Sequence, residues 1–160
     1  MTYLIDGHNL IPNIPGLKIS DLDDEAGLVK ILQKFSQKTR RSVEVYFDRA
    51  APGHAGSRQA GRVKVIFVHT QSTADQAIIK RLHTIVKEAP NFTVVTSDAR
   101  IQMEAKACHA KVISAKEFAN TLSDLLQNHE SIDNKNENVA LGQNEIQEWL
   151  DIFKSRKRQD

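Results

Sequence analysis

The chain has little cysteine and no long apolar run, and each shortage excludes a class of protein. Its 160 residues contain a single cysteine, Cys108, which rules out an internal disulfide and a zinc site built on several cysteines. No apolar stretch approaches the roughly 20 residues that cross a bilayer. The chain starts directly with a predicted strand rather than with a basic and apolar leader. We therefore expect a globular cytoplasmic protein that has no membrane partner.

An excess of charge of one sign is also lacking, because the formal net charge is only +2. The distribution of the charges is more informative than their sum. The segment 49–64 contains no acid and four strongly basic residues: Arg49, Arg58, Arg62 and Lys64. A basic loop beside acidic strand ends suits a metal site that acts on a polyanion, and we predict that these four side chains contact the phosphates of that polyanion.

Short apolar runs alternate with stretches of helical periodicity, which predicts a parallel α/β sheet covered by helices on both faces. The predicted strands are 2–6, 43–47, 64–68, 93–97 and 111–113. Helical patterns lie over 21–41, 73–86, 99–107 and 114–126. The Gly- and Ala-rich segment 49–63 has no periodicity and is predicted to be a loop.

The chain changes character after this alternating region. We predict a domain over 1–127, a flexible polar linker over 128–143, and an amphipathic helix with a basic end over 144–160. The apolar stripe of that last helix contains Trp149 and must be covered. It docks either on its own domain or on a protein partner.

Four aspartates stand at strand ends or open a helix. Asp6 is the last residue of the predicted strand 2–6. Asp48 and Asp98 directly follow predicted strands, and Asp75 opens the helix after strand 64–68. Ligands of open α/β sheets bind at the carboxyl ends of the strands, and converging like charges repel unless a cation neutralises them. Mg²⁺ and Mn²⁺ prefer oxygen ligands. We therefore predict a Mg²⁺ or Mn²⁺ site of Asp6, Asp75 and Asp98, although each alone also fits a cap or a turn.

Four polar residues near these aspartates are candidates for supporting roles: Asn9, Asp48, Ser97 and Gln102. Asn9 fits an amide that orients a carboxylate or a phosphate oxygen, and equally an Asx turn. Asp48 fits the outer shell of a metal or an ion pair with a basic neighbour. Gln102 would reach the site from helix 99–107, although a solvated position is the simpler interpretation. Thr73 fits either a helix cap ahead of Asp75 or a chemical role.

Four motifs in this order resemble the YacP-like branch of the NYN domain, within the PIN-like nuclease superfamily: Ile5-Asp6-Gly7-His8-Asn9-Leu10-Ile11, Tyr46-Phe47-Asp48, Ser72-Thr73-Ala74-Asp75 and Val95-Thr96-Ser97-Asp98. The resemblance covers about residues 1–126. It implies a three-layer α/β/α fold with a parallel five-stranded sheet of order 3-2-1-4-5. It also implies a metal-dependent endoribonuclease with an acidic pocket of Asp6, Asn9, Asp75 and Asp98, acting on RNA and associated with ribosomes.

The chain departs from this pattern at two positions where relatives carry acids, which are Gln76 and Gln102 here. Fewer carboxylates indicate one firmly held metal ion, or a descendant that binds RNA without cleaving it. Our hypothesis is a cytoplasmic endoribonuclease that cleaves single-stranded RNA with a metal-activated water. The alternative is a catalytically weak or inactive RNA-binding module. A phosphohydrolase for small esters is disfavoured, because Asp6 lacks the second aspartate of a phosphoaspartate mechanism.

Overall fold

A computed structural model describes residues 1–15, 22–48, 55–69 and 71–133 of the chain. Its elements, in chain order, are β1 (Thr2–Asp6), α1 (Gly7–Leu10), the 3-10 turn η1 (Ile11–Asn13), α2 (Leu22–Thr39), β2 (Ser42–Phe47), β3 (Gly56–Ala60), β4 (Val63–Phe67), α3 (Ala74–Thr84), the 3-10 turn η2 (Ala89–Asn91), β5 (Phe92–Val95), α4 (Ala99–Ala107), β6 (Lys111–Ile113) and α5 (Ala115–Asp133). The predicted α/β class is confirmed.

The sheet has six strands in the order β3-β4-β2-β1-β5-β6. Five of them are parallel to one another, and their order β4-β2-β1-β5-β6 is the predicted 3-2-1-4-5. The sixth strand, β3, pairs antiparallel with β4 at the edge of the sheet. The predicted loop over 49–63 is therefore wrong for residues 56–60, which form this strand.

Strand β3 exists because a tight hairpin turns the chain back onto the open edge of β4. Ala60 pairs with Val63, so that Gly61 and Arg62 form a two-residue turn. Gly61 has a φ of +62°, a conformation that glycine adopts without a steric penalty. The strand itself is mostly exposed, which explains why its sequence shows no apolar alternation.

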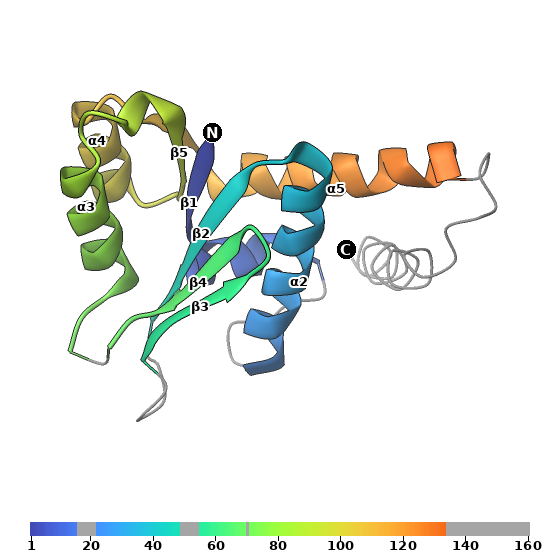
Figure 1. Ribbon diagram of the computed structural model, residues 1–160, viewed down its shortest axis with the longest axis horizontal. Coiled ribbons are helices and arrows are strands. Elements are labelled where there is room, and N and C mark those ends of the chain that lie inside the picture. Colours follow the sequence, from blue (N-terminus) through green and yellow to red (C-terminus); the bar gives the residue numbers. More distant parts are fainter. Residues whose placement is uncertain (16–21, 49–54, 70, 134–160) are drawn as a thin grey trace.

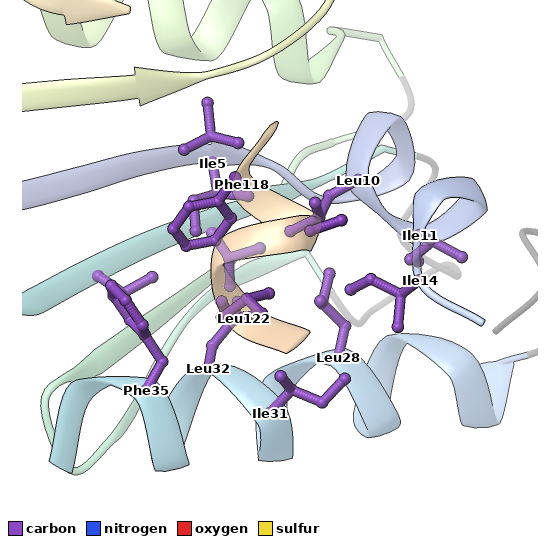
Figure 2. Close-up of a cluster of buried hydrophobic side chains, with 14 of the residues drawn as sticks. Ile5, Leu10, Ile11, Ile14, Leu28, Ile31, Leu32, Phe35, Phe118 and Leu122 are labelled. Carbon is purple, nitrogen blue, oxygen red and sulfur yellow. The ribbon is translucent and has the colours of Figure 1, made fainter. Parts of the chain in front are cut away.

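Helices cover the sheet on both faces, as Figure 1 shows: α2 and α5 lie on one face, and α3 and α4 lie on the other. The first face holds a core in which side chains of α1, η1, α2 and α5 meet the sheet. Figure 2 labels ten of these side chains: Ile5, Leu10, Ile11, Ile14, Leu28, Ile31, Leu32, Phe35, Phe118 and Leu122. The second face holds a separate core with Leu4, Ile78 and Ile101. Burial on both faces explains why the central strands are mostly apolar.

The last described helix, α5, continues to Asp133 and so extends into the segment 128–143 that the sequence predicts as a linker. Residues 134–160 lie outside the described part of the chain, which includes the rest of that linker and the predicted helix over 144–160. Both therefore stay predictions. Among the helices that the structure describes, none is both long and apolar enough to cross a membrane.

The turn after β1 is fixed by close packing against β2. A side chain at Gly7 would collide with the ring of Phe47, so only glycine fits where the turn crosses that strand. The chain then enters α1 and η1, which bring Leu10 and Ile11 into the core. Asp6 is thus held between a buried strand and a buried turn.

Candidate active site

The four predicted aspartates lie at the carboxyl edge of the sheet. Asp6 is the last residue of β1, and Asp48 directly follows β2. Asp98 caps the start of α4 after β5, and Asp75 lies in the first turn of α3. Strands β2, β1 and β5 are neighbours in the sheet, and α3 contacts both β1 and β2. The fold therefore brings together residues that are up to 92 positions apart; we call them the acidic cluster.

Asp6 is the most buried member of the acidic cluster. Its side chain lies within hydrogen-bonding reach of the Asp75 carboxyl, and only 6% of the residue is exposed. Burial raises the pKa of Asp6 to about 7, and the negative charges of Asp75 and Asp48 act in the same direction. The backbone amide of Asn9 acts in the opposite direction. Without a cation, the ionised form of Asp6 is therefore unfavourable near neutral pH.

Asp75 is presented by a well-capped helix. The hydroxyl of Thr73 accepts a hydrogen bond from the Gln76 backbone N–H at 3.1 Å, and the Gln76 side chain accepts one from the Thr73 N–H at 3.3 Å. This reciprocal arrangement is a capping box. Burial raises the pKa of Asp75, and the nearby Asp98 and Asp48 raise it further. Thr73 is therefore the cap that the sequence allowed, and Gln76 is engaged in the same cap.

Asp48 anchors that helix from the neighbouring strand. Its Oδ1 accepts a hydrogen bond from the backbone N–H of Ala74, the first residue of α3. The same side chain lies close enough to Asp6 and Asp75 to raise the pKa of both. Asp48 thus fixes the turn that carries Asp75 while it adds charge to the acidic cluster.

Asp98 serves as the N-cap of α4. Its Oδ1 accepts hydrogen bonds from the backbone N–H groups of Arg100 at 2.9 Å and Ile101 at 3.3 Å. Its own N–H donates to the hydroxyl of Thr96 at 3.1 Å. These contacts hold Asp98 at the rim of the acidic cluster, where its charge raises the pKa of Asp75.

Two amide side chains hold the loop between β5 and Asp98. The Oδ1 of Asn9 accepts a hydrogen bond from the Ser97 N–H at 2.8 Å. The Nε2 of Gln102 donates one to the carbonyl oxygen of Thr96 at 2.9 Å. The hydroxyl of Ser97 accepts from the N–H of Ala115, the first residue of α5, at 3.2 Å. The side chains of Asn9, Ser97 and Gln102, for which the sequence predicts supporting roles, therefore each form a hydrogen bond with a backbone group.

Comparison with known proteins agrees with this arrangement. The sequence profile of the YacP-like NYN domain matches residues 3–157 of the chain. The chain belongs to this family. Its structure is similar to the crystal structure of Rae1 (YacP) from Bacillus subtilis, with a TM-score of 0.71 and 26% identity, over 99% of this chain and 95% of that one.

A second crystal structure, of a single-substitution variant of the same Bacillus subtilis protein, gives a TM-score of 0.64 at 24% identity. That match spans 92% of this chain and 91% of the other. No curated protein matches the chain at a significant level. Membership in the YacP-like NYN family places the chain in the PIN-like nuclease superfamily, whose members typically use divalent metal ions.

The donor set of this NYN domain fits a hard divalent cation, because all four members of the acidic cluster offer carboxylate oxygens. Within the residues that the structure describes, no three His, Cys, Asp or Glu side chains already stand in the arrangement of a metal site. One oxygen of Asp48 and one of Asp98 are instead engaged by backbone N–H groups. Asp6 and Asp75 remain in direct contact, and Mg²⁺ commonly takes only one or two protein carboxylates.

The basic residues predicted to contact RNA are spread over the β3–β4 hairpin. Arg58 lies on β3, with its guanidinium 5.8 Å from the centre of the Phe67 ring, and Lys64 is exposed on β4. Arg62 lies in the hairpin turn and donates to the Arg40 carbonyl oxygen at 2.8 Å, beside the start of β2. It therefore lies at the opposite edge of the sheet from the acidic cluster. Arg49 falls outside the described residues.

A contact that sequence reasoning missed lies directly beside Asp6. The Nε2 of His8 is 2.7 Å from Oε1 of Glu25 on α2, and the His8 ring packs on Phe47. The two residues are 17 positions apart on separate elements, so the sequence gives no signal for the pair.

Proposed function

We propose that this NYN domain is a Mg²⁺- or Mn²⁺-dependent endoribonuclease that cleaves single-stranded RNA. The main supporting observation is the contact between Asp6 and Asp75. Both carboxyls have a raised pKa because they are partly desolvated beside other acids. Such an arrangement costs stability and is typical of sites that bind a cation or perform acid–base chemistry.

Asp6 and Asp75 would hold the cation, with Asp98 as the third ligand. When bound, the cation would act as a Lewis acid that neutralises charge on the scissile phosphate and activates a water molecule. The chain's own residues contribute the alignment. Asn9 joins the turn after Asp6 to the loop before Asp98 through its hydrogen bond to Ser97. Asp48 holds the start of α3 and with it Asp75.

The β3–β4 hairpin supports RNA as the substrate class. Guanidinium planes and aromatic rings are the surfaces on which proteins stack unpaired bases. Arg58 and Phe67 present this combination, and Phe67 stacks on Phe47, the residue before Asp48. Lys64 adds a positive charge on the neighbouring strand. Phosphate contacts of this kind give affinity rather than sequence choice. Association with the ribosome, which the family resemblance implies, is a further proposal.

Cleavage of a labelled single-stranded RNA in the presence of Mn²⁺ tests this function. We expect Asp6→Asn and Asp75→Asn each to lower the cleavage rate by at least about 100-fold, because each removes a charge that the cation requires. Asp124→Asn is the matched control, since Asp124 is an exposed residue of α5. Equal cutting by the wild type and both site variants would refute the proposal.

A catalytically inactive RNA-binding domain is the second candidate, and the engagement of Gln76 and Gln102 with backbone groups favours it. The family resemblance implies acids at these positions in part of the family, so this chain would have fewer carboxylates for a second ion. This candidate predicts RNA binding that weakens steeply with salt, together with no cleavage in Mg²⁺ or Mn²⁺ by wild-type protein.

A further inference from the structure

The peptide group between Thr96 and Ser97 is held at both of its ends by side-chain amides. Its carbonyl oxygen accepts from Gln102 Nε2 at 2.9 Å, and its N–H donates to Asn9 Oδ1 at 2.8 Å. Both distances are those of well-formed hydrogen bonds. Asn9 comes from the turn after β1, whereas Gln102 comes from α4. One peptide plane therefore joins two elements that are far apart in the sequence.

The same loop is fixed at its other polar atoms. The N–H of Thr96 donates to the Ile113 carbonyl oxygen at 3.2 Å, and the Thr96 hydroxyl accepts from the Asp98 N–H at 3.1 Å. Thr96 is fully buried. The Thr96–Ser97 peptide lies one residue before Asp98, the N-cap of α4, so these contacts and the two amide hydrogen bonds together hold the backbone that leads into Asp98.

We propose that Gln102 and Asn9 form an amide clamp on the Thr96–Ser97 peptide, and that Gln102 is a positioning residue that keeps Asp98 beside Asp75. Gln102 acts through the backbone and touches neither the cation nor the RNA. The inference rests on the proposed function only in the claim that Asp98 helps to bind the cation. The existence of the amide clamp itself can be tested without metal and without RNA.

The chemistry of the clamp explains why an amide rather than an acid stands at position 102. The Thr96 carbonyl oxygen needs a donor, and a glutamine side chain carries two N–H donors. An ionised glutamate has no donor and would place two negative oxygens against that carbonyl oxygen. Gln102→Glu is therefore not a conservative exchange here, although it restores an acid that relatives carry.

Amide hydrogen exchange measured by NMR on metal-free protein tests the amide clamp directly. We expect Gln102→Leu to speed exchange of the Ser97 N–H at least about fivefold, because the peptide loses the contact at its other end. The matched control is Gln59→Leu. Its amide donates to the Gly61 carbonyl oxygen at 2.8 Å within the β3–β4 hairpin, and its loss should leave Ser97 unchanged. Unchanged Ser97 exchange in Gln102→Leu would overturn the amide clamp.

Mn²⁺ binding measured by titration calorimetry tests the consequence for the site. Residues that orient metal ligands typically contribute about 10-fold or more to metal affinity. We expect Gln102→Leu and Gln102→Glu both to weaken Mn²⁺ binding about 10-fold, with the loss in RNA cleavage confined to kcat while KM stays within twofold. Tighter Mn²⁺ binding by Gln102→Glu would overturn the positioning role and mark position 102 as a ligand position.

These readouts separate the two proposals. If the Gln102 variants show faster Ser97 exchange and weaker Mn²⁺ binding while the wild-type protein does not cleave RNA, the positioning role is supported and the nuclease is refuted. Faster Ser97 exchange with unchanged Mn²⁺ affinity would refute the positioning role, while the nuclease would still depend on the Asp6 and Asp75 variants.

Discussion

Two carboxylates on neighbouring strands, the partly buried Glu44 of β2 and the buried Asp6 of β1, have opposite surroundings. Glu44 receives Nε and Nη2 of Arg81 at 3.1 and 3.0 Å, and the hydroxyl of Tyr46 donates to it at 2.9 Å. Asp6 instead faces two further acids, and its pKa rises to about 7. The fold supplies a cation to the first carboxylate, and we propose that the second takes one from solution. The first arrangement serves stability, and the second is a cost that only function explains.

The strongest way to break this comparison is to remove the cation from Glu44. We expect Arg81→Met to lower the free energy of unfolding by about 2–3 kcal/mol, because Glu44, whose side chain is 12% exposed, loses a two-point partner. Urea denaturation measures the change. Lys80→Met, on the same helix, is the control and should shift stability by less than about 0.5 kcal/mol. A loss of the same size in both variants would contradict the expectation.

Removing the charge from Asp6 should have the opposite effect. Its folded pKa of about 7 lies above the unfolded value of about 3.9, so the folded state binds more protons and wild-type stability falls as pH rises from about 4 through 7. We expect Asp6→Asn to stabilise the metal-free protein by about 1–3 kcal/mol at pH 8, and by much less at pH 4. Denaturation at both pH values checks this. A gain of equal size at the two pH values would show that the charge is not the cause.

A cation in solution should recover part of that cost for the wild type. An ion present at ten times its dissociation constant adds about 1.4 kcal/mol of stability. We expect Mn²⁺ at saturating concentration to raise the Tm of the wild type at pH 8 and to raise that of Asp6→Asn by less than a third as much. Differential scanning calorimetry with Mn²⁺ and with EDTA measures both shifts. Equal shifts would place the ion elsewhere.

The smallest expected effect concerns Gln76. Gln76→Glu keeps the acceptor of the capping box and adds a negative charge at a helix N-terminus, so we expect a gain of at most about 0.5 kcal/mol. We expect no tighter Mn²⁺ binding, because the side chain at position 76 hydrogen-bonds to Ser72 and Thr73. Titration calorimetry tests this. A clear gain in Mn²⁺ affinity would mean that the acid leaves the cap for the acidic cluster.

The sequence predicts those parts of the fold in which burial requires a pattern of apolar residues. The runs that end in Asp6 and Phe47 are mostly apolar because helices cover both faces of the sheet. The segment 111–113 is short, yet its position after a helix identifies β6. The strand β3 escapes prediction because pairing with β4, rather than burial, holds it in place. The segment does contain one residue type that suits a tight hairpin turn, the glycine at position 61.

The candidate site is also predictable only where burial shapes the sequence. Strand ends identify the acidic cluster, since a polar side chain at the end of a buried strand has few other positions. The hydrogen bonds of the Asn9 and Gln102 side chains are not predictable, because their partners are backbone atoms of a loop that comes close only in the folded chain. The pairing of His8 with Glu25 likewise depends on how α2 crosses the sheet.

The short outer strands have a consequence for the behaviour of the protein at high concentration. The rims of the sheet are β3, with five residues, and β6, with three. A rim of that length, carrying Arg58 on one side and Lys111 on the other, offers a foreign chain few hydrogen bonds and a repulsive charge. We therefore expect the described sheet to resist edge-to-edge polymerisation.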